Sequence, residues 1–131
     1  MGIGRAYGYI KPGLEPSLHP TTRDIAWAAG IVEGEGTIDS TPSERVTAVQ
    51  KKAWILYRLQ SLFGGSVKRR NSKGFKHGKV FVWMLCGARA RGFLMSAYSF
   101  LSPHRKRATR QALKGKTYAS KAWLTARRKA A

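Results

Sequence analysis

The sequence predicts an α+β fold in which helices pack on one face of a four-stranded antiparallel sheet, in the order helix, hairpin, helix, hairpin, helix, helix. Segments with apolar residues at helical spacing alternate with pairs of short strand-like segments, and turn sequences separate the members of each pair. The chain of 131 residues, 43% of them hydrophobic, is long enough for one domain with a core. We expect an irregular arm over residues 1–21, the domain over 22–113 and a basic tail over 114–131.

The first half of the domain is a helix followed by a hairpin. We expect the helix to begin near Thr22, to place Asp24 in its positive first turn and to end at Gly34–Gly36. Residues 36–40 and 45–50 read as antiparallel strands around a turn at 41–43.

The second half repeats this order and adds a last helix. A helix over 51–63 stops at Gly64-Gly65, and strands follow over 66–70 and 80–86. Helices are expected over 88–101 and 104–114, the latter with Ser102 as N-cap and Pro103 at its first position. We expect Cys86 to be a buried strand residue and Trp27, Trp54 and Trp83 to lie in the core.

The charge favours a polyanionic partner. The formal net charge is +19, and all six acids lie within the first 44 residues, whereas 22 of the 25 cations lie from Arg45 onward. Nucleic acid is the simplest partner for such a chain. A membrane surface is the weaker alternative, and no apolar run is long enough to span a membrane.

The acids of one segment suggest a bound cation. Glu33 and Glu35 follow a helix with small residues at Ala26, Ala29 and Gly30, and a helix C-terminus disfavours carboxylates. A hard divalent ion such as Mg²⁺ combines carboxylate and phosphate oxygens. The alternative is that both glutamates are solvated turn residues. No zinc site is expected, because the histidines are scattered and Cys86 is the one cysteine.

Residues 28–36, Ala-Ala-Gly-Ile-Val-Glu-Gly-Glu-Gly, resemble the LAGLIDADG motif of homing endonucleases. Ala28 stands where the family has Leu, and Glu33 and Glu35 stand where it has Asp. The order αββαββα over residues 22–113 also fits that family, whereas the arm and the tail lie outside the resemblance.

The resemblance implies a homodimer that holds metal at its two-fold axis. Glu35 would be the metal ligand, with Gly36 beside it, and Mg²⁺ or another divalent cation would be the cofactor. Ala26, Ala29, Gly30 and Glu33 would lie at or near the dimer interface. One motif per chain implies two chains on a partly palindromic site in double-stranded DNA.

Two further positions match the family's accessory site. Gln50 ends a strand where these enzymes carry a polar residue that orients the attacking water, although a helix-capping residue is the alternative. One of His104, Arg105 and Lys106 would stabilise the charge developing on the phosphate. The alternative for each of the three is a helix N-terminus that contacts phosphate.

Alternation along the strands predicts the residues that read DNA. The outward-facing polar positions are Thr37, Asp39, Arg45, Thr47, Lys68 and Arg70. A carboxylate suits the cytosine amino group, and arginine suits guanine. Arg69 is expected to point away from this face.

The implied function is a site-specific double-stranded DNA endonuclease that hydrolyses phosphodiester bonds with a divalent metal. No small-molecule cofactor and no membrane partner are expected. The alternatives are a non-catalytic nucleic-acid binder on the same fold, such as an intron maturase or DNA-binding regulator, and a ribosomal-type RNA-binding protein. The first residues lack a secretion signal, so an intracellular location is expected, in a bacterial or phage cytoplasm or an organelle matrix.

Overall fold

The computed structural model describes residues 19–40, 43–71 and 79–114. They form the expected α+β arrangement of helices on one side of a four-stranded antiparallel sheet. In chain order the elements are α2 (Thr22–Glu35), β1 (Gly36–Asp39), β2 (Arg45–Gln50), α3 (Ala53–Phe63), β3 (Ser66–Asn71), β4 (Lys79–Cys86), α4 (Gly87–Ala97), the 3₁₀ turn η1 (Tyr98–Phe100) and α5 (Pro103–Leu113). The expected arm before residue 19 and the tail after 114 lie outside the described residues.

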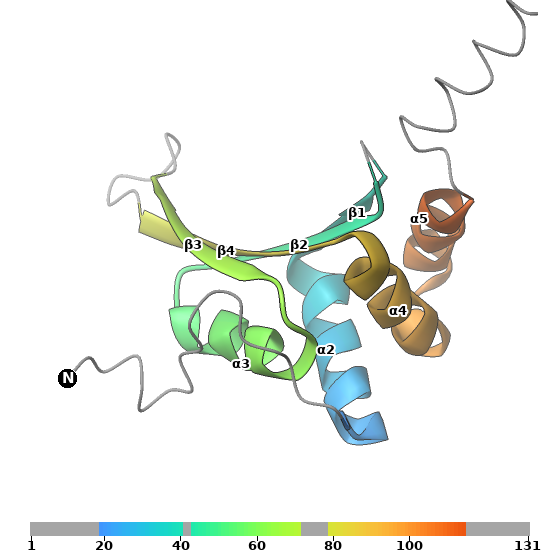
Figure 1. Cartoon of the computed structure of the whole chain (residues 1–131), viewed down its shortest axis with the longest axis horizontal. Coiled ribbons are helices and arrows are strands. Elements are labelled where there is room, and N and C mark those ends of the chain that lie inside the picture. Colours follow the sequence, from blue (N-terminus) through green and yellow to red (C-terminus); the bar gives the residue numbers. More distant parts are fainter. Residues whose placement is uncertain (1–18, 41–42, 72–78, 115–131) are drawn as a thin grey trace, which may run out of the picture.

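The sheet has the strand order β1-β2-β4-β3, with every neighbouring pair antiparallel. Helices α2, α3 and α4 lie on one side of it, and α5 lies at the edge next to β1 (Figure 1). Both ends of the sheet turn away from the helices, so the opposite face is open and concave.

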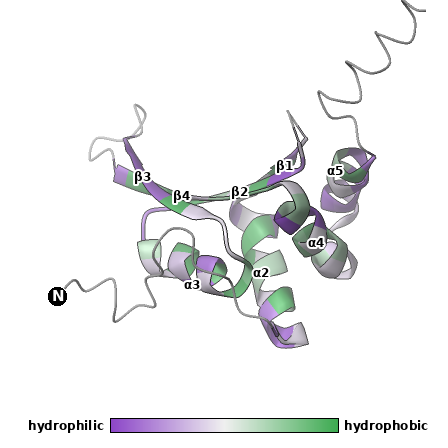
Figure 2. Cartoon of the chain, in the orientation of Figure 1, coloured by the Kyte–Doolittle hydropathy of each residue, from purple (hydrophilic) through white to green (hydrophobic). Residues whose placement is uncertain are grey.

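The core lies between the sheet and the helices. Ala28, Ala29 and Val32 of α2 pack against Val46 and the other inward residues of the strands. Trp83 is the largest fully buried side chain, and its Nε1–H donates a hydrogen bond of 2.9 Å to the carbonyl of Gly64. The green, apolar stretches of the strands lie in the middle of the sheet and the purple ones towards its ends (Figure 2).

Local sequence determines where the helices begin and end. Thr21, rather than Thr22, caps α2 in a reciprocal capping box with Asp24. Ser102 caps α5 with Pro103 at its first position, as predicted. Helix α3 ends at Gly64, and the φ angles of 82° at Gly64 and 90° at Gly65 explain why glycines occupy the predicted stop.

Two residues expected in the core are exposed. Trp54 is 48% exposed, because it lies in the first turn of α3 on the side away from Leu56 and Leu59. Cys86 is also exposed, because it ends β4 on the open face opposite Arg45. Trp83 is in the core and Trp27 is half-buried. None of the helices in the described ranges is long and apolar enough to cross a membrane.

Candidate active site and candidate nucleic-acid interface

Glu35 is the last residue of α2, and Gly36 begins β1 directly after it. A Cβ at Gly36 would lie 2.7 Å from the carbonyl oxygen and 2.8 Å from the Cα of Val32, so only glycine allows this tight passage from helix to strand. Glu35 is exposed, and within the described part of the chain no donor or cation pairs with its carboxylate. The junction therefore presents an unneutralised acid at a helix end whose dipole disfavours one.

Glu35 and Gln50 line the same hollow. Its volume is about 400 Å³, and its other lining residues are Val49, Lys51, Lys52 and Val80. Gln50 ends β2, and the two lysines form the connection into α3. The structure thus brings together the predicted metal ligand and the predicted water-orienting residue from segments 15 positions apart.

Lys51 and Lys52 are residues that sequence reasoning missed at this site. Both are exposed, and they precede the N-terminus of α3, whose N-cap Lys52 makes no side-chain capping bond. Their position directly after Gln50 in the sequence could have indicated that they lie at the same site. The hollow therefore combines one carboxylate, one amide and two ammonium groups, a donor set suited to a metal-bound phosphate.

Glu33 has a different role from Glu35. Its carboxylate accepts hydrogen bonds from the backbone N–H of Ser102 at 2.7 Å and from the Ser102 hydroxyl at 2.9 Å. Arg105 lies 3.8 Å from the same carboxylate and also donates to the Glu33 carbonyl at 3.2 Å. These contacts hold the pKa of Glu33 below its ordinary value, chiefly through the Ser102 backbone hydrogen bond. Glu33 thus joins the end of α2 to the start of α5 within one chain.

The three basic candidates on α5 do not line the hollow beside Glu35. Arg105 contacts Glu33, and the Lys106 ammonium lies 5.5 Å from the centre of the Tyr98 ring. His104 is exposed on the first turn of α5. The contact between residues 33 and 102 is a tertiary one, so the local sequence gave no sign that Arg105 would pair there.

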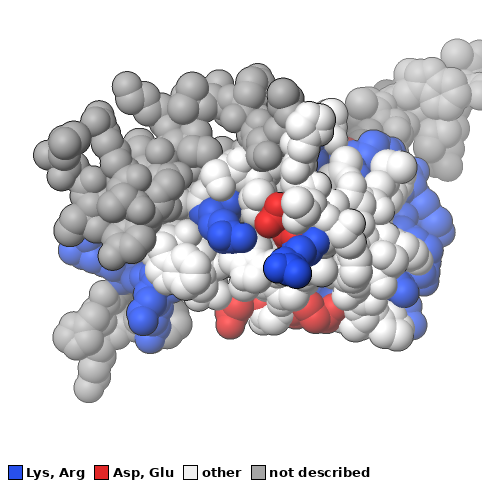
Figure 3. Space-filling view, turned by 90° about the horizontal axis from the view of Figure 1, so that it is seen from below, with Lys and Arg blue, Asp and Glu red and all other residues white. Residues whose placement is uncertain are grey.

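Helix α2 has an exposed face made of small residues. Gly30 and Gly34 are exposed, and a Cβ at either would meet no atom within 4 Å; Ala26 is half-buried beside them. Ala29 differs from the expected arrangement, because it is fully buried in the chain's own core. Lys and Arg gather at the edge that carries α5, and the middle of the described helical side carries basic patches beside an acidic one (Figure 3).

The strand register confirms which predicted reading residues share a face. Thr37 pairs with Thr47 and Asp39 with Arg45, whereas the buried Ile38 and Val46 pair on the helical side. On the other half of the sheet the same parity places Lys68 opposite Val82 and Arg70 opposite Val80. All six predicted positions therefore lie on the open face: Thr37, Asp39, Arg45, Thr47, Lys68 and Arg70.

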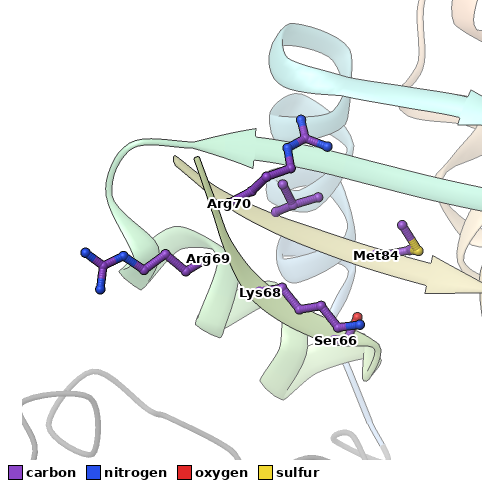
Figure 4. Close-up of a pocket in the computed structure, with 6 residues that line it drawn as sticks. Ser66, Lys68, Arg69, Arg70 and Met84 are labelled. Carbon is purple, nitrogen blue, oxygen red and sulfur yellow. The ribbon is translucent and has the colours of Figure 1, made fainter. Parts of the chain in front are cut away.

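A second hollow of about 290 Å³ lies on this face between β3 and β4. Ser66, Lys68, Arg69, Arg70, Val82 and Met84 line it. Lys68 and Arg70 project to one side of β3, whereas Arg69 extends to the other, as predicted (Figure 4). The open face of β4 is apolar in its middle, where Val82 is buried and Met84 is half-buried, so cations of β3 border an apolar strip.

A divalent metal fits the Glu35 hollow only if water and substrate phosphates supply most of its ligands. No group of three His, Cys, Asp or Glu side chains within the described ranges could hold an ion. Mg²⁺ commonly takes one or two carboxylates and completes its shell with water and substrate phosphates. One exposed carboxylate beside an amide is compatible with that mode of binding and not with a closed, all-protein cage.

The fold, a concave four-stranded antiparallel sheet backed by helices, is that of the homing endonucleases. No family model and no curated protein matches the sequence. The likeness is one of structure.

The structure is similar to that of the homing endonuclease I-CvuI in complex with its target in the presence of calcium. The identity is 20%, the TM-score is 0.57, and the match covers 68% of this chain and 62% of that one. A second similar structure is that of I-CvuI in complex with an I-CreI target in the presence of magnesium, in which the DNA is not cleaved. Its TM-score is 0.55 at 20% identity, and the match covers 67% of this chain and 62% of that one.

The group I intron-encoded homing endonuclease I-CeuI, complexed with DNA, is similar at a TM-score of 0.56 and 12% identity. That match covers 82% of this chain and 57% of the other. The matched region thus spans about three fifths of the length of these structures.

Proposed function

We propose that this chain is a site-specific endonuclease of the LAGLIDADG homing endonuclease family, which cuts double-stranded DNA with a divalent metal. The observation that carries the proposal is the hollow shared by Glu35 and Gln50, at the edge of an open face with six outward polar residues. An RNA-binding protein with this charge would have no need for an unpaired carboxylate at a helix end. The similarity to homing endonucleases complexed with DNA supports the same reading.

The residues of the hollow have separable roles in this proposal. Glu35, with Gly36 beside it, holds the metal, which when bound activates water and stabilises charge on the phosphate. Gln50 orients the attacking water through its amide. Lys51 and Lys52, which line the hollow, supply positive charge beside the scissile phosphate.

Two chains are needed for both strands to be cut, because each chain supplies one Glu35. The small-residue face of α2 supports a homodimer. A glycine inside a helix costs about 1 kcal/mol relative to alanine, and nothing within the described chain fills the space above Gly30 or Gly34. A second α2 packed closely there accounts for both glycines, and it would bring the two Glu35 residues together across the two-fold axis.

The direct test compares the wild type with Glu35→Gln and Glu35→Asp. Target DNA is first selected by binding from a random duplex library, and cutting is then measured with Mg²⁺. We expect Glu35→Gln to lose at least about 100-fold in cleavage rate with DNA affinity unchanged. Glu35→Asp, which restores the residue of the family motif, is expected to keep cutting.

Sequence-specific binding with no cutting by the wild type, in Mg²⁺ or Mn²⁺, would show a non-catalytic binder such as a maturase or regulator. Stronger binding to structured RNA than to duplex DNA would contradict both readings and favour an RNA-binding protein.

A further inference from the structure

An ion pair joins two strands on the open face, at the hairpin end of β1 and β2. Asp39 and Arg45 are direct cross-strand partners in the register. Arg45 Nε donates to Asp39 Oδ1 at 3.1 Å, and Arg45 Nη2 donates to Oδ2 at 2.9 Å. The side chains are 35% and 33% exposed, so the pair is neither buried nor freely solvated.

The geometry of this pair leaves one edge of the guanidinium for a ligand. Asp39 uses the Nε–H and one Nη2–H, which form the side edge of the fork. The end edge, made of Nη1 and the second Nη2–H, is not used by Asp39. That edge is the one with which arginine donates two parallel hydrogen bonds to the O6 and N7 atoms of guanine.

Asp39 therefore holds the arginine in one orientation. A free arginine on a surface loses rotamer freedom on binding, and a carboxylate that fixes the fork beforehand reduces this loss. The hydrogen bonds and charge of Asp39 also raise the pKa of Arg45, a guanidinium that is charged at neutral pH in any case. The same carboxylate can accept from the amino group of cytosine, so donor and acceptor together match one G·C pair.

The position of the pair along β2 limits which base pair it reaches. Arg45 begins β2 and Gln50 ends it. Five residues of extended strand span about 17 Å. At 3.4 Å per base-pair step, this distance corresponds to about five steps of DNA from the phosphate beside Gln50.

Resting on the function proposed above, we infer that Asp39 and Arg45 act as one unit that reads a single G·C base pair, about five steps from the cut in each half-site. Arg45 contacts guanine in the major groove, and Asp39 is the positioning residue that aims it. The substrate is then a duplex with a G·C pair fixed at that symmetric position, whereas the apolar centre of the face imposes no such requirement.

Exchanging the two residues distinguishes an ion pair that recognises a base pair from one that only stabilises the hairpin. Bound duplexes are selected from a random library without divalent metal and are then sequenced. The proteins compared are the wild type, Asp39→Asn, Arg45→Lys and the double variant Asp39→Arg with Arg45→Asp. The double variant keeps an ion pair at the same register position, so it controls for folding of the hairpin. Lys68→Gln, on the opposite edge strand of the same open face, is the control for a general loss of phosphate or base contacts.

We expect the wild type to prefer G·C at one position per half-site by about 5- to 150-fold. Arg45→Lys and Asp39→Asn should lower that preference to within about threefold of random while the other positions keep theirs. The exchanged variant should replace the preference at that position, with cytosine taking the place of guanine on the same strand.

An unchanged G·C preference in both single variants, or a wild-type profile with no G·C position in that range, would overturn the inference while leaving the endonuclease proposal standing. An exchanged variant with the wild-type profile would also overturn it, by showing a structural ion pair. Recovery of no preferred duplex by the wild type would instead overturn the proposed function itself, and the inference with it.

Discussion

Glu33 and Glu35 are two residues apart, yet they have unlike surroundings and unlike roles. Glu35 faces an open hollow without a partner among the described residues, whereas Glu33 accepts two hydrogen bonds from Ser102. The Glu33 carboxylate thereby satisfies backbone donors at the start of α5 and interacts favourably with the positive end of that helix. At the residue scale, one acid stabilises the fold and the other remains available for chemistry.

The pH dependence of stability should reveal the role of Glu33. Its folded pKa is lowered from the ordinary value of 4.5, so its contribution is complete above that value and is lost as the pH falls through the folded pKa. We expect Glu33→Gln to lower stability by about 1 kcal/mol at pH 7. Urea unfolding at pH 7 and pH 3 measures this, and the difference between the two proteins should shrink at pH 3. An equal difference in unfolding free energy at pH 7 and pH 3 would contradict the proposed interaction between the Glu33 carboxylate and the start of α5.

At the element scale, α2 has two faces that sequence patterning did not separate fully. Ala28, Ala29 and Val32 pack on the sheet, whereas Gly30 and Gly34 face outward with empty space above them. The chain's own packing explains the first set, and the α2 helix of a second chain, as proposed above, would explain the second.

Replacing Gly34 with alanine should therefore have two opposite effects. In the isolated chain we expect a stabilisation of up to about 1 kcal/mol, because alanine is the better helix former and the space is open. In the dimer we expect a weaker association, because the added methyl groups hold the helices apart. Sedimentation and thermal unfolding over a range of concentrations measure both effects. A variant as dimeric as the wild type would place the interface elsewhere.

Periodicity and turn residues were sufficient to predict the helices and strands, but not every side-chain contact between them. Ser102-Pro103 and Gly64-Gly65 act locally, and they set helix ends where expected. The alternation of β2 likewise predicted the outward side of Arg45. The contact between Glu33 and Ser102 joins residues 69 positions apart, so local sequence could not predict that Arg105 would be drawn away from the Glu35 hollow.

At the scale of the whole molecule, charge and shape are complementary to DNA. The chain carries a net charge of +19, and the concave open face bears Lys68, Arg70 and Arg45. Strong self-repulsion in such a chain is relieved when a polyanion binds. One Glu35 carboxylate per chain and one exposed glycine face on α2 per chain are consistent with a symmetric pair of chains on a two-fold DNA site.

The cleavage pattern of a mixed dimer tests this account most directly. Wild-type chains and Glu35→Gln chains carrying different tags are purified as a heterodimer and incubated with Mg²⁺ and a supercoiled plasmid containing the selected site. The account predicts nicked circles, with one strand cut, since each Glu35 serves one half of the site. Linear product at the wild-type rate, or a single chain that cuts both strands, would contradict it.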